Sequence, residues 1–258
     1  MRKLLSIGAL AALTLTGADA LAADTCTKII STGHPNYPAI AFKKGKSIVG
    51  AAPTLVEAIA KDLNVPLESK YMGSWSDAQK ATREGKANMI VGVYYNDKRA
   101  KYLDYVQPAF QYDPVVVFVA KDRKFDYSGQ DDLIGKKGAT NKGESYGNEF
   151  DAFIKDKLDV KRTDGLKAAF ESLMAGKVDY VIAGYYPGDA EINDMDIEDK
   201  VMALEPAVVT AEMFVAFSKK SPCATLAPKF SEEITEMTTD GRFHKMLLDA
   251  IAEWDAEH

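Results

Sequence analysis

The pattern of apolar and polar positions occurs twice along the chain. Residues 85–95 read Gly-Lys-Ala-Asn-Met-Ile-Val-Gly-Val-Tyr-Tyr, and residues 176–186 read Gly-Lys-Val-Asp-Tyr-Val-Ile-Ala-Gly-Tyr-Tyr. Each copy follows a helical stretch, turns at Gly-Lys and then runs apolar, which is typical of a buried parallel strand. Ligands of open α/β sheets lie outside the carboxyl ends of the strands. We therefore expect two similar α/β lobes that face one another, with both tyrosine pairs at the ends of strands.

The rest of the chain continues this alternation. Strands are predicted at 28–31, 65–71, 115–119, 136–140, 201–204 and 213–217. Helices are predicted at 54–63, 76–84, 96–102, 144–157 and 166–174, and in two segments after 226 that Asp240-Gly241 separates. This order favours a mostly parallel α/β protein. No low-complexity linker divides the halves, so the chain is expected to cross between lobes near 111–114 and 208–212.

The first 22 residues are typical of a secretory signal peptide. Arg2 and Lys3 precede the apolar run 4–15, and small residues at 20–22 predict cleavage after Ala22. Without this segment, which also holds Asp19, the chain carries 30 basic and 37 acidic residues. This negative balance argues against nucleic acid or an anionic membrane as a partner.

Two cysteines, Cys26 and Cys223, occur in the whole chain. An even count in an exported protein favours a disulfide, and the alternative is a pair of buried free thiols. The three histidines are scattered and form no metal-ligand spacing with the cysteines. We therefore expect no metal site, and no motif for a cofactor was identified.

Several segments together resemble the extracellular solute-binding proteins of polar amino acid ABC transporters. Asn96-Asp97-Lys98-Arg99 stands where that family carries Thr-x-x-Arg, and residues 104–110 stand where it carries Asp-Phe-Ser-x-Pro-Tyr. The segments 131–137 and 143–147 and the pair Asp240-Gly241 also match in order and spacing. The resemblance covers the whole chain after residue 22.

The resemblance implies a type II periplasmic binding fold, in which two crossing strands join two lobes with a ligand cleft between them. Lobe 1 would be residues 23–112 and 211–258, and lobe 2 residues 113–210. It implies a periplasmic monomer that captures an amino acid or a related carboxylate-bearing solute by lobe closure and delivers it to a membrane permease. It implies no enzymatic activity. It also places the two cysteines in one lobe, where a disulfide can form.

Ten residues are expected to bind the ligand. Arg99 matches the arginine that holds the ligand carboxylate, a role suited to the planar guanidinium, although a solvated arginine in a charged run is the alternative. Glycine at position 92 allows close backbone approach, and segment 141–145 precedes a helix whose free N–H groups attract anions. The aromatic residues could stack on the ligand or pack in the core. The set is Tyr37, Trp75, Gly92, Tyr94, Asn96, Arg99, Asn141, Glu144, Ser145 and Tyr185.

The chain departs from the family where the ammonium group of an amino acid would bind. Gly184 stands in register with the usual Asp, and Val93-Tyr94-Tyr95 replaces a serine-rich segment. Either Glu144 or Asp189 takes over the missing charge, or a substituted amine rests on aromatic faces. The candidate faces belong to Tyr37, Trp75, Tyr94, Tyr95, Tyr185 and Tyr186.

Three other functions are alternatives to solute capture for transport. Gly143-Glu144-Ser145-Tyr146-Gly147 fits the G-x-S-x-G elbow of serine hydrolases, with His244 downstream, but a polar segment leads into it. Some relatives of the binding family are cyclohexadienyl dehydratases, for which Glu144 could be the acid if its pKa were raised. A third possibility is delivery of the ligand to a membrane sensor.

Overall fold

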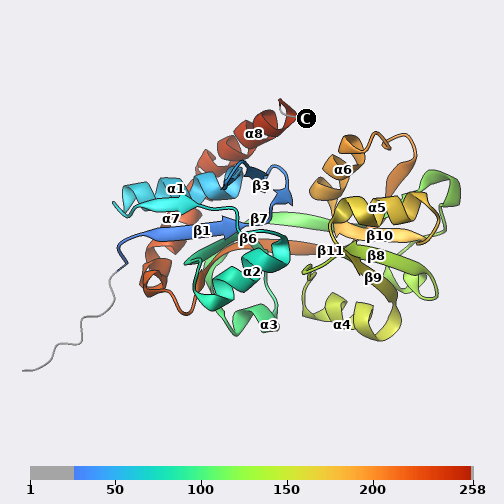
Figure 1. Cartoon of the computed structure of the whole chain (residues 1–258), viewed down its shortest axis with the longest axis horizontal. Coiled ribbons are helices and arrows are strands. Elements are labelled where there is room, and N and C mark those ends of the chain that lie inside the picture. Colours follow the sequence, from blue (N-terminus) through green and yellow to red (C-terminus); the bar gives the residue numbers. More distant parts are fainter. Residues whose placement is uncertain (1–25, 257–258) are drawn as a thin grey trace, which may run out of the picture.

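The chain folds into two lobes that share one continuous β-sheet, as the computed structural model of residues 26–256 shows (Figure 1). The predicted signal peptide at 1–22 lies outside the described residues. The eight strands of the sheet follow the order β5-β1-β6-β11-β7-β10-β8-β9. The half with β5, β1 and β6 is called lobe 1, and the half with β10, β8 and β9 is called lobe 2.

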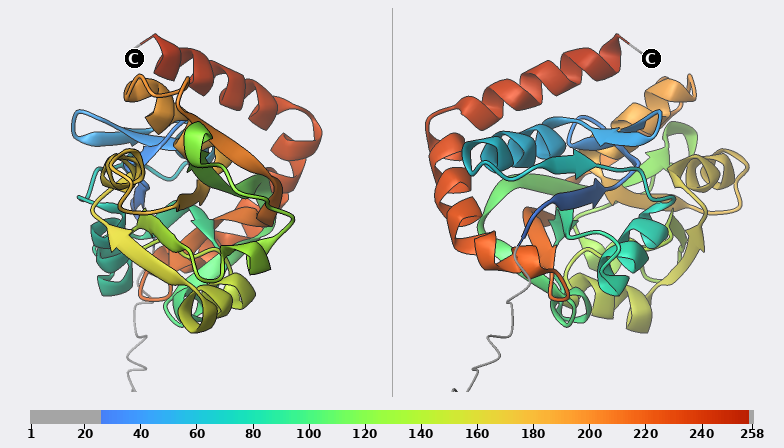
Figure 2. Two further views of the ribbon diagram at one scale, coloured as in Figure 1. Left: turned by 90° about the vertical axis from the view of Figure 1, so that its right-hand side faces the viewer. Right: turned by 60° about the vertical axis from the view of Figure 1, so that its left-hand side comes forward.

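Lobe 1 is built around three parallel strands with helices on both sides. The strands are β1 (Ile29–Gly33), β5 (Leu67–Ser69) and β6 (Met89–Tyr94). The helices are α1 (Ala51–Asp62), α2 (Trp75–Glu84), α3 (Asp97–Ala100), α7 (Ala227–Thr239) and α8 (Arg242–Asp255). A small antiparallel sheet joins β2 (Asn36–Tyr37), β3 (Ala41–Lys44) and β4 (Ser47–Val49). Helix α8 packs along α1 on the outside of this lobe (Figure 2).

Lobe 2 repeats the plan with fewer elements. Its parallel strands are β8 (Lys137–Asn141), β9 (Asp159–Thr163) and β10 (Tyr180–Gly184). Its helices are α4 (Asn148–Lys157), α5 (Leu166–Met174) and α6 (Tyr185–Asp194). The 3₁₀ turns of the chain lie at Lys121–Arg123, Gln130–Leu133 and Pro222–Leu226.

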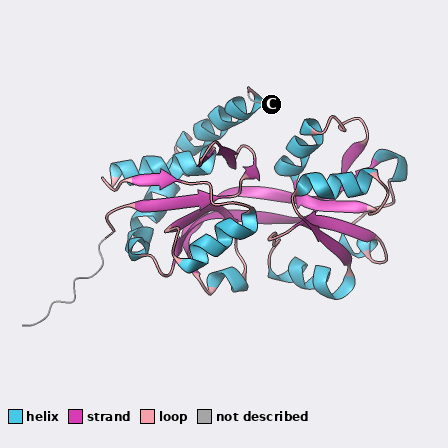
Figure 3. Ribbon diagram, in the orientation of Figure 1, coloured by secondary structure: helices cyan, strands magenta, loops and turns pink. Residues whose placement is uncertain are grey.

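Two long antiparallel strands run through both lobes. They are β7 (Leu103–Ala120) and β11 (Val201–Ser218), and they lie side by side at the centre of the sheet (Figure 3). Their ladder runs from the pair Leu103–Ser218 in lobe 1 to the pair Ala120–Val201 in lobe 2. The register shifts between Leu204 and Val209 and again between Met213 and Val215. The strands predicted at 201–204 and 213–217 are therefore parts of one strand.

The repeated pattern forms two equivalent units, as predicted. Helix α2 leads through Gly85 into β6, and α5 leads through Gly176 into β10. Both glycines turn the chain with a positive φ, 80° for Gly85 and 66° for Gly176, which glycine adopts without strain. The units flank the central strand pair on opposite sides, because β6 pairs with β11 and β10 pairs with β7. The α/β fold class is confirmed. Helix α4, however, begins at Asn148 and not at 144.

Burial follows the apolar positions of the sequence. Leu55, Val56 and Ile59 on α1 are fully buried, which matches the apolar face predicted for this helix. In lobe 1 the ring centroids of Phe217 (β11) and Phe230 (α7) lie 5.2 Å apart. In lobe 2 those of Phe118 (β7) and Phe170 (α5) lie 5.5 Å apart. Within residues 26–256, no helix is long and apolar enough to cross a bilayer.

A disulfide joins the two chain segments that build lobe 1. Cys26 precedes β1, and Cys223 lies in the turn that follows β11, with the two Cα atoms 4.6 Å apart. The bond therefore ties the start of the described chain to the segment that returns from lobe 2, and it spans 197 residues of sequence.

Reduction of this disulfide is expected to lower the free energy of unfolding by up to about 5 kcal/mol, because it releases a long closed loop in the unfolded chain. Urea denaturation with and without dithiothreitol measures the difference. The double variant Cys26→Ser/Cys223→Ser is the control, since the reductant should have no effect on it. Equal stabilities of oxidised and reduced protein would show that the bridge adds nothing.

Candidate functional site

The lobes meet where several strands end at their carboxyl ends. Gly33 ends β1 and Tyr94 ends β6 in lobe 1, while Asn141 ends β8 and Gly184 ends β10 in lobe 2. This is where open α/β sheets bind ligands. In this structure the cleft is closed, and polar side chains from both lobes fill it.

A buried carboxylate lies at the crossing of the lobes. Asp113 of β7 is 0% exposed, and its Oδ2 accepts hydrogen bonds from the hydroxyl groups of Tyr37 and Tyr94. The two hydroxyl oxygens are also 2.5 Å apart. The second oxygen, Oδ1, is buried without a hydrogen-bond partner. Sequence analysis missed Asp113, although a lone acid next to the β-branched run 115–119 at a predicted crossing was a usable signal.

This environment changes the pKa of all three groups. Burial raises the pKa of Asp113 to about 6; the tyrosine bonds oppose the change, and the charge of Glu144 adds to it. Burial, together with the charge of Asp113, raises the pKa of Tyr37 and of Tyr94 well above the usual range. Both tyrosines are therefore neutral and can act as donors toward the carboxylate.

Gly184 makes room for this cluster. A Cβ atom at this position would lie 2.2 Å from the hydroxyl oxygen of Tyr37 and 2.4 Å from Oδ2 of Asp113. No side chain fits there while the cluster is in place. Position 184 carries no acid, but Asp113 lies on the neighbouring strand β7, two residues before Val115, the residue with which Gly184 pairs.

Glu144 reaches across the cleft to His34. Nε2 of His34 lies 3.1 Å from Oε1 of Glu144, while Nδ1 accepts the backbone N–H of Asn36. Because Nδ1 accepts this bond, Nε2 is the ring nitrogen that donates to Glu144. Asn141 donates to the same carboxylate oxygen at 3.2 Å. Burial alone would raise the pKa of Glu144, but the bonds from His34 and Asn141 and the charge of Arg99 hold it below the usual value.

The guanidinium of Arg99 is held by protein acceptors. It is 3% exposed, and its Nε, Nη1 and Nη2 donate to the side-chain oxygen of Gln79 and to the carbonyl oxygens of Tyr94 and Gly143, each at 3.0 Å. Gly143 belongs to lobe 2, so this arginine bridges the lobes. Its predicted role as a carboxylate clamp stays a prediction.

Further hydrogen bonds close the two lobes around this arginine. Asn96, which caps α3, donates to the hydroxyl oxygen of Ser145 at 2.7 Å, and Ser145 donates to Asp151 at 2.5 Å. On the opposite side, Asn36 of lobe 1 donates to Glu191 of α6 at 2.9 Å. Four of the predicted residues thus join the lobes directly: Asn96, Arg99, Glu144 and Ser145.

Two cavities that share lining residues lie in the closed cleft, and a groove of about 580 Å³ between the lobes is lined by Asn96, Arg99, Glu144 and Ser145, among others. The deep cavity is lined by His34, Asn36, Tyr37, Tyr94, Glu144 and Gly184, among others, and its volume is about 10 Å³, about the space that one water molecule needs. The mouth cavity has a volume of about 350 Å³, and both lobes line it. The two share His34, Asn36 and Leu166, and the mouth also includes Trp75 and Asn141. The ring centroids of Trp75 and His34 lie 5.2 Å apart. The buried indole N–H of Trp75 has no hydrogen-bond partner.

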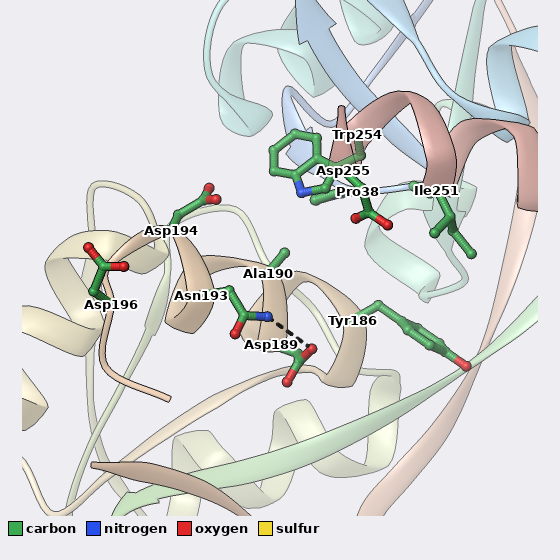
Figure 4. Close-up of a pocket in the computed structure, with 11 residues that line it drawn as sticks. Pro38, Tyr186, Asp189, Ala190, Asn193, Asp194, Asp196, Ile251, Trp254 and Asp255 are labelled. Carbon is green, nitrogen blue, oxygen red and sulfur yellow. Dashed lines mark hydrogen bonds between the residues drawn. The ribbon is translucent and has the colours of Figure 1, made fainter. Parts of the chain in front are cut away.

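A larger cavity lies apart from the deep and mouth cavities. It has a volume of about 820 Å³ and lies between α6 and the end of α8, where Asp189 and Tyr186 line it (Figure 4). Asp189 is exposed and accepts a hydrogen bond from Asn193 one turn along α6. The helix therefore presents Asp189 away from the deep cavity, so of the two predicted replacement acids only Glu144 lines it.

The remaining predicted residues have other roles. Gly92, with a φ of 69°, is the extra residue in an irregularity of the β6–β11 ladder and lines neither cleft cavity. Tyr185 begins α6, is 40% exposed and contacts Tyr186 edge to face. It lines neither cleft cavity either.

The serine hydrolase interpretation is wrong for this fold. Ser145 lies in the loop that precedes α4 and is bound to Asp151 and Asn96. His244 is exposed on α8 of the other lobe. No group of three or more His, Cys, Asp or Glu side chains that could hold a metal occurs in the described part of the chain.

Comparisons with known proteins agree with this architecture. The sequence profile of "Bacterial extracellular solute-binding proteins, family 3" matches residues 29–249. A search of the curated proteins found no match.

Similar solved structures include both transport and sensor proteins. The substrate-binding protein AbpA of an amino acid ABC transporter from Streptococcus pneumoniae, bound to L-arginine, is 21% identical, with a TM-score of 0.71 over 88% of this chain and 96% of that one. A histidine kinase sensor domain similar to periplasmic binding proteins is 22% identical, with a TM-score of 0.73 over 90% and 97%. The GluR0 ligand-binding core in complex with L-glutamate is 15% identical, with a TM-score of 0.73 over 87% and 98%. At these identities the likeness is one of fold.

The stability of the protein is expected to depend on the ionisation of Asp113. Folding raises its pKa from 3.8 to about 6, so the contribution of this group is fully present below about pH 4 and is lost as the pH rises through 6. The variant Asp113→Asn has no carboxyl group to ionise at this position, so its stability should not fall in this way as the pH rises. Between pH 4 and 7 the unfolding free energy of the variant should gain about 3 kcal/mol relative to the wild type. Urea denaturation across this range measures the gain, and parallel pH profiles would contradict it.

Gly184→Ala is expected to lower the free energy of unfolding by about 1 to 3 kcal/mol, because the added methyl group overlaps Tyr37 and Asp113. Gly129→Ala is the matched control, since its Cβ position is open and its backbone is extended. Denaturation of both variants tests the difference. Equal stabilities would mean that the cluster does not need the glycine.

Proposed function

The chain belongs to the bacterial extracellular solute-binding proteins of family 3, and we propose that it is the periplasmic solute-binding component of an ABC importer. It would capture a small polar solute, an amino acid or a related amine, by closing its two lobes, and it would release the solute to a membrane permease. The signal peptide would direct export and would be cleaved after Ala22.

The observation that carries this proposal is the cleft itself. Polar side chains at the carboxyl ends of strands from both lobes converge there, and they bind one another across the lobe boundary. Arg99 bridges to the Gly143 carbonyl, Asn96 to Ser145 and Asn36 to Glu191. A cleft whose two walls are complementary suits a protein that works by opening and closing.

The chain path supports a hinge. Only β7 and β11 connect the two halves of the sheet in the described chain, and their ladder is interrupted between Leu204 and Val209, close to the lobe boundary. We propose lobe 1 as residues 23–112 and 211–258 and lobe 2 as residues 113–210. Rotation about the two strands at this boundary would open the cleft.

Similar proteins support an amine-bearing ligand. AbpA is bound to L-arginine, and ArtJ from Geobacillus stearothermophilus is an arginine-, lysine- and histidine-binding protein. The cleft of this chain, which Glu144 lines and behind which Asp113 is buried, is compatible with a solute that carries an ammonium group.

The two alternative functions receive less support. A dehydratase would need a cleft acid with a raised pKa, but the pKa of Glu144 is lowered. Asp113 has a raised pKa, but two hydroxyl groups cover its Oδ2 and its Oδ1 is buried. A sensing role uses the same fold in the histidine kinase domain, so it differs from transport in the membrane partner and not in the cleft.

A thermal-shift screen against amino acids, amines and organic acids tests the function. A ligand at a hundred times its Kd stabilises the folded state by about 2.7 kcal/mol, which raises the melting midpoint by about 5 to 10 °C for a chain of this size. Small-angle scattering should then show the same or a smaller radius with ligand than without. If no compound of any class shifts the midpoint at millimolar concentration, solute binding is refuted.

Arg99→Ala separates a latch from a ligand clamp. If the guanidinium mainly joins the lobes, the variant loses about 3 kcal/mol of stability with its charge-assisted hydrogen bonds, and its ligand-free radius of gyration increases. A clamp that acts on ligand alone predicts an unchanged ligand-free radius and loss of binding for carboxylate-bearing ligands. Scattering and calorimetry on the same samples distinguish the two.

A further inference from the structure

The deep cavity offers hydrogen-bond acceptors, and the donors His34 and Asn36 that line it are already bound to Glu144 and Glu191. Tyr37 and Tyr94 donate their hydroxyl protons to Oδ2 of Asp113 and their oxygens contact each other, so each hydroxyl oxygen keeps one lone pair to accept. Both tyrosines line the deep cavity, and so does Glu144. An ionised carboxylate only accepts. An occupant of this cavity therefore meets acceptors on several sides.

The carboxylate of Asp113 makes no contact with a cation. Its hydrogen bonds come from the neutral hydroxyl groups of Tyr37 and Tyr94, whereas Glu144 is bound by His34 and its pKa is lowered by His34 and Arg99. Oδ1 of Asp113 is fully buried and has no partner. A buried charge without a partner is costly, and one monovalent cation would offset it.

The space limits the shape of that cation. The deep cavity holds about 10 Å³, which fits a head group the size of a water molecule and nothing larger. The mouth cavity of about 350 Å³ shares three lining residues with it and is bordered by the ring of Trp75. An ammonium group can occupy the first space while a short organic chain extends into the second.

Neither cavity offers a free cation for a ligand carboxylate. Arg99 lines neither of them; it lines a groove between the lobes that shares Glu144 with the deep cavity, and its guanidinium is bound there by Gln79 and by two carbonyl oxygens. The basic residues that line the two cavities are His34, which is bound to Glu144, and Lys142, which is paired with Asp164 at 2.7 Å. A carboxylate carried in with the amine would meet hydrogen-bond donors such as the indole N–H of Trp75, but no unpaired cation to offset its charge.

We infer that the solute is a small organic monoamine without a carboxylate, bound with its ammonium group between Glu144 and the hydroxyl oxygens of Tyr37 and Tyr94. Asp113 is the positioning residue, because it orients both hydroxyl groups and supplies the compensating charge. This inference rests on the proposed solute-binding function and narrows its ligand class.

Matched pairs of amines and their parent amino acids test the inference. Calorimetry on the full mature chain compares ethylamine with alanine, ethanolamine with serine, histamine with histidine and tyramine with tyrosine. At least one amine should bind ten or more times more tightly than its parent. Ammonium chloride is included as a further probe, and binding of ammonium alone overturns the assignment of an organic ligand.

Variants then locate the site for the amine that binds best. Asp113→Asn and Glu144→Gln should each weaken binding at least tenfold, and Asp189→Asn, which removes an exposed carboxylate outside the cleft, should not change it. Glu144→Gln carries the test alone if Asp113→Asn fails to fold. Unchanged affinity in both cleft variants would falsify the placement.

The outcomes distinguish a failure of this inference from a failure of the proposed solute-binding function on which it rests. If a parent amino acid binds as tightly as its amine, or if no amine binds, the inference is wrong. The solute-binding function still holds in that case, provided that amino acids or organic acids raise the melting midpoint.

Discussion

A carboxylate buried where two lobes cross must receive hydrogen bonds, and the cleft is organised by how Asp113 obtains them. Its donors, Tyr37 and Tyr94, come from β2 and β6 of lobe 1. Gly184 of lobe 2 leaves the room that these groups occupy. One buried charge therefore explains the residue types at three positions on three other strands, including the glycine where an acid was expected.

Much of the fold could be predicted from the sequence because burial in parallel strands and amphipathic helices leaves a strong pattern. The dense runs 115–119 and 213–217 and the two Gly-Lys turns were of this kind. The sequence carries weaker signals for β9 and for the lobe 1 half of β7. Strand β9 is an edge strand, so its solvent-exposed positions are polar. The lobe 1 half of β7 contains Pro108, and because residues 107–110 lie outside the regular ladder with β11, the proline displaces no ladder bond.

The site was less predictable for a physical reason. A local motif places a residue on an element, and four residues that the resemblance singled out, Asn96, Arg99, Glu144 and Ser145, lie at the lobe boundary. What each side chain binds there depends on the closure of the two lobes, which no local pattern encodes. Gly143 belongs to a loop that the sequence singled out, but no pattern showed that its backbone carbonyl is the acceptor that Arg99 and Gln79 share across the cleft.

Counting protons connects closure with the charge of the cleft. The oxygens of Tyr37, Tyr94 and Asp113 make three mutual contacts, but the two hydroxyl groups supply two protons. An ionised Asp113 leaves one contact between two oxygens without a proton, and a protonated Asp113 fills it, which agrees with the raised pKa of this group. The ammonium group of a ligand would bring positive charge to the same oxygens by another route. Proton and ligand would then compete to neutralise one carboxylate, so uptake of the ligand would be linked to release of a proton from Asp113.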